Sequence, residues 1–391
     1  MCYGRLQVPL TQIRTLQLKF TNLKPSLRKQ LYSLIILNLS RVLVFNMSLI
    51  ATICCCGSSQ PSLLTINGKR YRIQRLIGEG GLSFVYLVKS QEGESLALKK
   101  IRCPFGSIGS ISPAMKEVNN YKRFHSPYIA QIVDSQVCQE KDGSKTVYIL
   151  VPYFSKGSLQ DEINRSLLNC TEMPELDVVR LAVGIARGLL CIHEASPNDD
   201  ADVAYSIVST PYNEETSFLN DLELDTFGES QQSYAHRDLK PSNVMISPEG
   251  IPVISDLGSC SRAYTEINSR QALLQFQEWR SEHCTPAFTA PEIIDVQLKS
   301  VITEKCDIWS LGCTIYTMCY GISPFEREEQ VSGASVTYAI TTGKYTIPQG
   351  THRNKDLVDI IIKCLNVNAD ERPSIDELLA LLMDVQSQLV P

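Results

Sequence analysis

The chain has 391 residues, of which 43% are hydrophobic and 20% are charged, so it can bury a core and is not intrinsically disordered as a whole. A formal net charge of -5 leaves no basic surplus and disfavours binding to DNA or RNA. The 14 cysteines have the spacing of neither a disulfide framework nor a zinc site, which indicates a reducing compartment.

Residues 1–46 are basic and apolar, and the first acidic residue of the whole chain is Glu79. Three interpretations of this extension stay open. It could be a transmembrane helix through residues 31–53, at the cost of burying Arg41. It could be a mitochondrial-type presequence, or a disordered extension upstream of a true start at Met47. The charge asymmetry predicts that this part meets a membrane or lies outside the fold.

Residues 47–66 are expected to form a cysteine-rich leader. Cys54, Cys55 and Cys56 follow an apolar run, and nothing around them has the pattern of a folded element. Thioester-linked acyl chains add about 0.8 kcal/mol per buried CH₂, so two or three chains would hold a soluble domain at a bilayer. Acylation is therefore favoured over three buried cysteines, and N-myristoylation is excluded because no Gly follows Met1 or Met47.

The remaining chain is expected to form an α+β fold of two lobes. Short apolar runs separated by turn residues predict a small lobe of antiparallel strands plus one helix over 67–154, including a connecting hinge. Apolar residues at helical spacing predict a larger, α-rich lobe over 155–388. Within that lobe, residues 195–233 hold nine acidic and no basic residues, so we expect a disordered, solvated insertion there.

A glycine-rich turn joins two of the predicted strands at Gly78, Gly80 and Gly81. Glycines let the backbone approach a polyphosphate closely and point N–H groups at its oxygens. The signal is weak alone, because glycine-rich hairpins are common and Ser83 stands at the third glycine position of the motif.

A lysine and a glutamate further along the chain strengthen the interpretation of this turn as a phosphate-binding element. Lys99 ends the predicted strand 96–99, and Glu117 lies eighteen residues later, at the start of a predicted helical stretch. A strand lysine neutralises phosphate charge only if its flexible side chain is fixed, which a helix-borne carboxylate can do. Lys100 is the competitor, but neighbouring residues of a strand point to opposite faces.

Downstream residues supply groups suited to phosphoryl transfer. Asp238 can accept the proton of an attacking hydroxyl, and Lys240 can steady the transferring group. Asn243 and Asp256 carry the oxygen ligands that Mg²⁺ prefers. These residues belong to three motifs in chain order: HRDLKPSN at 236–243, DLG at 256–258 and APE at 290–292.

With these motifs the chain resembles the eukaryotic protein kinases from about residue 70 to about residue 385. Lys240 and Thr285 resemble the serine/threonine class, so the resemblance implies transfer from ATP, with Mg²⁺, to protein Ser/Thr hydroxyls. It also implies that Asp307 braces the catalytic loop and that Glu292 pairs with Arg372.

The same resemblance implies a nucleotide pocket. Val151 would be the gatekeeper, the Pro152 carbonyl and the Phe154 N–H would read adenine, and Val85, Ala97 and Met245 would enclose the base. The complete implied set is Ile77, Gly78, Gly80, Gly81, Ser83, Val85, Ala97, Lys99, Glu117, Pro152, Phe154 and Met245.

More narrowly, the chain resembles the Numb-associated kinase group and its myristoylated and palmitoylated branch, within it the fungal palmitoylated vacuolar-membrane kinases. The likeness to the group rests on GEGGLSFV at 78–85, the hinge VPYFSKGSL at 151–159, DLGS at 256–259 and DIWSLGC at 307–313. The narrower likeness rests on GKRYRIQRLIGEGG at 68–81, QEKDGSKTVYI at 139–149 and GISPFEREEQ at 321–330, and on the cysteine run just ahead of the kinase-like part. It implies acylation of the cysteine run by a palmitoyltransferase, the cytoplasmic face of the vacuolar membrane as location, and a role in restraining vacuole fusion.

The activation segment, residues 256–292, carries apolar residues at Ala272, Leu273, Phe276 and Trp279, a spacing that predicts a helix over 269–283. Because members of this branch carry a helix there, we expect substantial basal activity, with a phosphorylation-gated loop as the rival. Two rival functions also stay open: a membrane-anchored pseudokinase scaffold, and a small-molecule kinase, which the APE motif and the helices beyond it disfavour.

Overall fold

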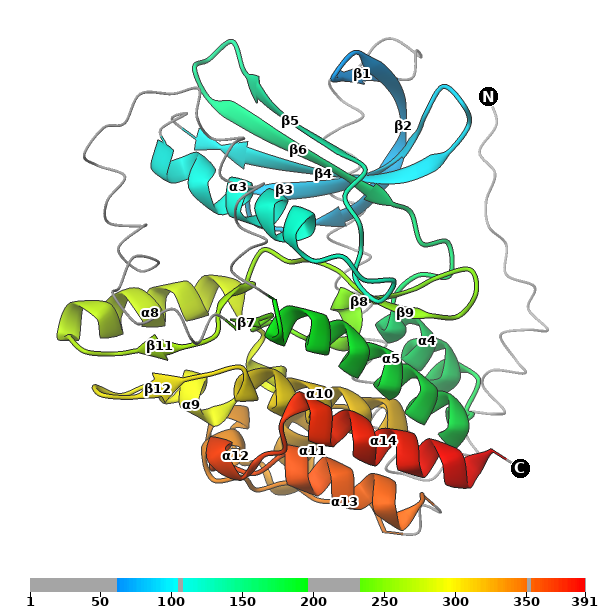
Figure 1. Cartoon of the computed structure of the whole chain (residues 1–391), viewed down its shortest axis with the longest axis vertical. Coiled ribbons are helices and arrows are strands. Elements are labelled where there is room, and N and C mark those ends of the chain that lie inside the picture. The colour runs from blue at the N-terminus through cyan, green and yellow to red at the C-terminus, as the bar shows by residue number, and fades with distance from the viewer. Residues whose placement is uncertain (1–61, 105–107, 196–232, 350–352, 391) are drawn as a thin grey trace. The chain divides into compact units, whose positions relative to one another are not determined.

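The computed structural model describes residues 62–104, 108–195, 233–349 and 353–390 (Figure 1). The predicted extension 1–46, the Cys54 to Cys56 run and all but the two end residues of the insertion 195–233 lie outside the described residues. Among the described residues, no helix combines the length and the apolar character that crossing a bilayer requires.

A six-stranded antiparallel sheet forms the first part of the described fold, in the order β1-β2-β3-β4-β6-β5. Its first strand lies in residues that the sequence assigned to the leader, so the folded unit begins at Ser62 rather than at residue 67. The strands are β1 (Leu63–Ile66), β2 (Lys69–Glu79), β3 (Ser83–Lys89), β4 (Ser95–Cys103), β5 (Asp134–Gln139) and β6 (Lys145–Pro152).

The two faces of this sheet bury different residues because successive side chains alternate along each strand. Leu96 and Leu98 of β4 lie in an outer apolar cluster with Ile66 and Tyr71. The alternate residues of β4 point to the opposite, inner face, which the helix α3 (Ile108–Arg123) crosses (Figure 1). Glu117 lies in the interior of α3, which corrects the expectation that it stands at a helix start.

The second part of the fold is helical and is built around α10, which is buried from Cys306 to Cys319. Helix α5 packs against both α10 and α14. The helices are α4 (Leu159–Leu168), α5 (Glu175–His193), α8 (Arg270–His283), α9 (Pro291–Ile294), α10 (Lys305–Tyr320), α11 (Pro324–Ser332), α12 (Val336–Thr341), α13 (Lys355–Cys364) and α14 (Ile375–Leu389). A small β-rich part with one helix and a larger helical part confirm the predicted α+β two-lobed fold.

Short strands position the loops between α5 and α9. They are β7 (Tyr234–Ala235), β8 (Val244–Ile246), β9 (Pro252–Ile254), β10 (Ser261–Arg262), β11 (Thr265–Glu266) and β12 (Val301–Ile302), paired as β7·β10, β8·β9 and β11·β12. The β8–β9 hairpin lies directly on α5. The two approach so closely at Gly188 that a Cβ there would come within 2.7 Å of the Ile254 side chain, so glycine is what allows this contact. The HRDLKPSN loop joins β7 to β8, and the DLG triplet follows β9.

Candidate active site

Lys99 stands at the centre of the site, on the inner face of the sheet. Its Nζ donates to both carboxylate oxygens of Glu117 on α3, at 2.8 and 2.9 Å, and to Oδ1 of Asp256 at 2.8 Å. The Lys99–Glu117 pair expected from the sequence is therefore present. Lys100 points to the outer face, where its Nζ lies 5.9 Å from the centroid of the Tyr148 ring.

The electrostatics favour the charged forms of Lys99 and Asp256, whereas burial raises the pKa of Glu117 above its ordinary value despite the nearby Lys99 ammonium. Burial alone would lower the pKa of the Lys99 ammonium, but the carboxylates of Glu117 and Asp256 outweigh it and raise that pKa above its ordinary value. Burial would likewise raise the pKa of Asp256, but the Lys99 ammonium holds it below its ordinary value. Near neutral pH the strand therefore presents a fixed cation beside a free carboxylate oxygen.

The glycine-rich turn is a tight hairpin between β2 and β3. The Gly80 N–H donates to the Ser83 carbonyl at 2.8 Å, and a Cβ on Gly80 would lie 2.9 Å from the Ser83 hydroxyl. Ile77 falls in an irregularity of the register, after which Gly78 pairs with Val85. Ser83, at the third glycine position of the motif, is the first residue of β3. It is not among the residues with positive φ, so its backbone does not require glycine.

Strand register brings the expected base-enclosing residues onto one face. Val85 lies directly opposite Lys99, and Ala97, two residues before Lys99, lies opposite Val151. All four therefore share the inner face. Met245 belongs to the helical part, where it forms a β-bridge with Ser158, the N-cap of α4.

The segment after β6 connects the sheet, which carries Val85, Ala97 and Lys99, to α4 and the helical part, which contains Met245. Pro152 ends β6, and because proline has no N–H its main chain can offer only a carbonyl to a ligand. The Phe154 carbonyl accepts from the Gly157 N–H at 3.1 Å, which forms the turn that leads to α4.

Asp238 is held by three neighbours. Its Oδ1 accepts from the Thr285 N–H at 2.9 Å, and its Oδ2 accepts from Lys240 Nζ at 2.6 Å. Lys240 also donates to the Thr285 hydroxyl at 2.5 Å, as the resemblance implied. Asn243 Nδ2 donates to the Asp238 main-chain carbonyl at 2.9 Å. A carboxylate, an ammonium and a hydroxyl are thus fixed together at one point.

Two oxygen atoms of this arrangement suit a magnesium ion. The amide nitrogen of Asn243 is used by Asp238, so its Oδ1 is the atom left to act as a ligand. Asp256 gives one oxygen to Lys99 while about half of its side chain stays exposed. Mg²⁺ prefers such oxygen donors and is usually bound by one or two protein ligands together with substrate phosphates.

The backbone is strained at both motifs that carry these groups. Arg237 and Asp256 have φ values of 65° and 59°, in the left-handed region that non-glycine residues rarely adopt. The buried Asp307 holds the first motif by accepting from the His236 N–H at 2.7 Å and the Arg237 N–H at 2.8 Å. Tyr121 holds the second by accepting at 3.0 Å from the N–H of Asp256. Asp307 therefore braces the catalytic loop, as expected.

Sequence reasoning missed three supporting residues. Asn120 Nδ2 donates to the carbonyls of Leu257 and Cys260, both at 2.9 Å, and Tyr121 supports Asp256. Both follow Glu117 by three and four positions, so the one-face rule of a helix could have found them. His193, whose Nε2 lies 3.0 Å from Asp307 Oδ2, gave no such signal because 114 positions separate the two residues.

The expected pair between the activation segment and a late segment is also present. Arg372 donates from its two terminal nitrogens to the two carboxylate oxygens of Glu292, both at 2.8 Å. Arg372 is 2% exposed, so this bidentate ion pair is buried at its guanidinium end.

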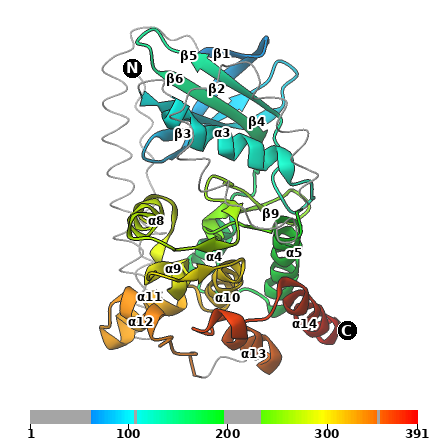
Figure 2. The same cartoon turned by 60° about the vertical axis from the view of Figure 1, so that its left-hand side comes forward.

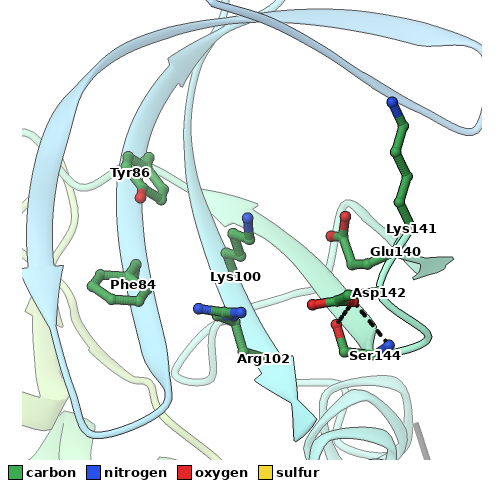
Figure 3. Close-up of a pocket in the computed structure, with 8 residues that line it drawn as sticks. All are labelled: Phe84, Tyr86, Lys100, Arg102, Glu140, Lys141, Asp142 and Ser144. Carbon is green, nitrogen blue, oxygen red and sulfur yellow. Dashed lines mark hydrogen bonds between the residues drawn. The ribbon is translucent and has the colours of Figure 1, made fainter. Parts of the chain in front are cut away.

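A separate hollow of about 500 Å³ opens on the outer face of the sheet (Figure 3). Lys100 and Arg102 project between two aromatic rings of β3 and the turn that joins β5 to β6. Its lining residues are Phe84, Tyr86, Lys100, Arg102, Glu140, Lys141, Asp142 and Ser144. Because it lies on the face opposite Lys99, it is not part of the candidate site.

Comparison with known proteins agrees with this geometry. Residues 71–196 and 230–381 match the protein kinase domain family. Three similar proteins are serine/threonine-protein kinase ENV7 of Saccharomyces cerevisiae (48% identical over 361 residues, covering 87% of this chain and 99% of the relative), serine/threonine-protein kinase ppk13 of Schizosaccharomyces pombe (36% over 322 residues, 81% and 91%) and serine/threonine-protein kinase 16 of Homo sapiens (31% over 332 residues, 85% and 95%).

The chain therefore belongs to the protein kinase family. Within that family it is a serine/threonine kinase of proteins, as its named relatives are, and the family as a whole uses ATP and a divalent metal ion. The small-molecule kinase considered from the sequence is thereby set aside.

Proposed function

We propose that the chain transfers the γ-phosphoryl group of ATP, bound with Mg²⁺, to Ser/Thr hydroxyls of proteins at the site built by Lys99, Asp238, Lys240, Asn243 and Asp256. The observation that carries this proposal is the direct link between the two parts of the fold: the Lys99 ammonium of the sheet bonds to the Asp256 carboxylate that follows β9. This contact brings the phosphate-binding lysine to the metal-binding triplet.

Each side chain has a separate task in this proposal. Lys99, held by Glu117, neutralises phosphate charge, and Lys240 stabilises charge on the transferring group. Asp238 orients the acceptor hydroxyl and takes its proton. Asn243 and Asp256 hold Mg²⁺, which when bound neutralises the phosphate oxygens.

The nucleotide would lie between the inner face of the sheet and β8. Val85 and Ala97 would cover one side of the base, Met245 the other, and the chain after β6 would bond its edge through the Pro152 carbonyl and the Phe154 N–H. The glycine-rich turn and the rest of the expected set, Ile77, Gly78, Gly80, Gly81 and Ser83, would cover the sugar and phosphates. The shared strand face of Val85, Ala97 and Lys99 supports this placement.

The experiment that tests this function is phosphoamino-acid analysis of protein labelled by the purified chain from radioactive ATP. We expect phosphoserine or phosphothreonine and no phosphotyrosine. Asp238→Asn should abolish the label while leaving thermal unfolding unchanged, and a cellular effect that survives this substitution would favour the scaffold alternative.

High basal activity is the second element of the proposal, and the contacts of Arg237 support it. Its guanidinium already has three oxygen acceptors, on Arg262 at 2.7 Å, Ala263 at 3.1 Å and Thr265 at 2.7 Å. It also lies against two rings of α8, 5.9 Å from the centroid of Phe276 and 5.4 Å from that of Trp279. These contacts join the catalytic loop to the activation segment through groups of the chain itself, which supports activity that does not depend on a phosphate group.

Treatment of the purified protein with a phosphatase tests this element. We expect activity to stay within about twofold of the untreated protein, because Arg237 Nη2 already donates to three oxygen acceptors and the guanidinium already lies against the α8 rings. Loss of activity after dephosphorylation would show a phosphorylation-gated loop instead.

Membrane attachment is the third element, and it concerns residues outside the described ones. We propose that a palmitoyltransferase acylates Cys54, Cys55 and Cys56, and that the acyl chains hold the kinase on the cytoplasmic face of the vacuolar membrane, where it restrains fusion. Two points support this: the run ends shortly before Ser62, where the folded unit begins, and the motifs resemble the palmitoylated fungal branch. The proposal keeps the domain limits of 1–46 for the extension and 195–233 for the insertion, and shortens the leader from the predicted 47–66 to 47–61 because β1 occupies Leu63–Ile66.

Intact-mass analysis of the native protein before and after hydroxylamine tests the attachment. We expect a mass loss that corresponds to thioester-linked chains, and the same spectrum locates the amino terminus at Met1 or Met47. An unchanged mass would contradict acylation.

A further inference from the structure

Four basic side chains lie on one face of the β2–β3 ribbon, and we call Arg70, Arg72, Arg75 and Lys89 the basic ribbon. Arg72 lies directly opposite Lys89, and Arg75 lies opposite Leu87, two residues before Lys89 on the same strand. Arg70 precedes Arg72 by two positions on β2. Side chains alternate along a strand, so Arg70 and Arg72 share one side of the sheet with Lys89. Arg75 joins them because the register shifts between Ile73 and Arg75, which places Arg75 opposite Leu87. All four side chains are exposed.

The basic ribbon has no acidic partner in the part of the chain that the structure describes. None of its four residues takes part in an ion pair there, and the contact of Arg75 is with the Tyr153 hydroxyl at 3.5 Å. Glu92 and Glu94, which lie between β3 and β4, form no ion pair with these four residues in that part of the chain.

This arrangement is unfavourable in isolation. Like charges directly opposite each other on neighbouring strands, as at Arg72 and Lys89, destabilise a sheet. A partner of opposite charge on this face would remove the repulsion, so the arrangement indicates an anionic ligand surface.

An apolar side chain and the route of the chain favour a membrane as that surface. Leu63 of β1 lies directly opposite Arg72 and is 65% exposed, so an apolar group projects among the cations. The seven steps between successive Cα atoms from Cys56 to Leu63 span at most about 25 Å when fully extended. An acyl chain on the cysteine run would therefore keep the basic ribbon close to lipid headgroups.

We propose that the basic ribbon, with Leu63, binds the anionic lipid surface of the membrane to which the kinase is attached. The proposal rests on the proposed acylation for its location, but the contact itself is independent of acyl chains. One acyl chain alone binds membranes reversibly, and a cluster of basic residues is a second signal that makes attachment stable. Basic side chains near an anionic leaflet attract it, and salt screens that attraction.

The test uses the full chain with Cys54, Cys55 and Cys56 changed to Ser, so that no acyl chain contributes. Co-sedimentation is measured with phosphatidylcholine vesicles and with vesicles that also contain about 30% phosphatidylserine. We expect binding to the second kind at low salt and its loss at about 500 mM salt. Arg72→Gln with Lys89→Gln should weaken that binding about 25-fold, or about fivefold for each charge.

A matched control removes the same charge from the other face of the same sheet. Lys100 and Arg102 both line the outer hollow (Figure 3). The double variant Lys100→Gln with Arg102→Gln should change binding to the anionic vesicles less than twofold. Activity on a soluble protein substrate should be unchanged in the Arg72/Lys89 variant, which shows that it is folded. If that variant does not fold, Arg70→Gln with Arg75→Gln replaces it.

Equal binding by the wild-type chain and the Arg72/Lys89 variant, or an equal loss in the control variant, would overturn the proposal. Binding to soluble polyglutamate but not to anionic vesicles would assign the basic ribbon to an acidic protein instead, and would overturn it too. These outcomes leave acylation untouched, because the hydroxylamine experiment reports on that separately.

Discussion

Asp307 shows how one buried residue sets the geometry of the site. Its carboxylate accepts from two successive main-chain N–H groups of the catalytic loop and lies 3.0 Å from the His193 ring. Burial would raise its pKa, but the hydrogen bonds from His193 and from the Arg237 N–H hold it below the ordinary value of 3.8. The strained backbone at Arg237 persists because this carboxylate fixes it.

A pH dependence of stability follows from the lowered pKa of Asp307. The carboxylate contributes stability that is present above its unfolded value, about pH 4, and is lost as the pH falls through the lower folded value. We therefore expect the free energy of unfolding of Asp307→Asn to fall less steeply than that of the wild type below about pH 4. Urea unfolding at several acidic pH values measures this difference, and parallel curves would contradict it.

Asn120 provides a second prediction at this scale. Asn120→Ala removes donors from two main-chain carbonyls beside the DLG triplet, and should cost about 1–3 kcal/mol of unfolding free energy and lower phosphotransfer. The neighbouring Asn119→Ala is the control, because no hydrogen bond joins the Asn119 side-chain oxygen to another described residue. Equal effects of the two substitutions in urea unfolding would contradict the role of Asn120.

At the scale of elements, α8 links the activation segment to the catalytic loop through its contacts with Arg237. The helix, which is seen nearly end-on in Figure 2, begins at the capping residue Ser269 and carries Trp279, which faces Arg237. We expect Trp279→Ala to lower basal phosphotransfer by roughly tenfold, because a cation–π contact of about 0.5–2 kcal/mol that orders the segment is lost. Leu274→Ala, at a site 60% exposed on the same helix, should have no such effect in a steady-state assay.

Elements with strong periodicity could be predicted from the sequence, and elements without start signals could not. The spacing of Phe276 and Trp279 predicted a helix over 269–283, and α8 is found at Arg270–His283. The start of α3 was missed because its first turn has no acidic residue and Pro113 lies inside it. Strand β1 was missed because its four residues are recognisable only through their pairing with β2.

At the scale of the whole molecule, the site depends on contacts between residues far apart in the sequence. Lys99 and Asp256 are separated by 157 positions, and no local pattern predicts that they meet. Their convergence could be anticipated only through the ordered kinase motifs. Of the residues that support it, Asn120 and Tyr121 share a helix face with Glu117 and could have been inferred from their spacing, whereas the contact of His193 with Asp307 became visible only in the structure.

The Glu292–Arg372 pair ties the activation segment to the helical part and gives a prediction at this scale. Arg372→Ala would leave a carboxylate without its buried partner, so we expect a loss of about 3–5 kcal/mol in the free energy of unfolding. Guanidinium denaturation measures it. A loss below about 1 kcal/mol, the value typical of an exposed pair, would contradict the structural role.

The most direct test of the account is phosphate transfer from radioactive ATP to a protein substrate by the wild-type chain and by five single variants. The account predicts that Lys99→Met, Asp238→Asn, Asn243→Ala and Asp256→Ala each lower the rate by at least about 100-fold, because each removes one group of a single Mg²⁺–ATP site. Lys100→Met should keep nearly full activity, because its side chain lies on the other face of β4. Full activity in any of the first four variants, or an equal loss in Lys100→Met, would contradict the account.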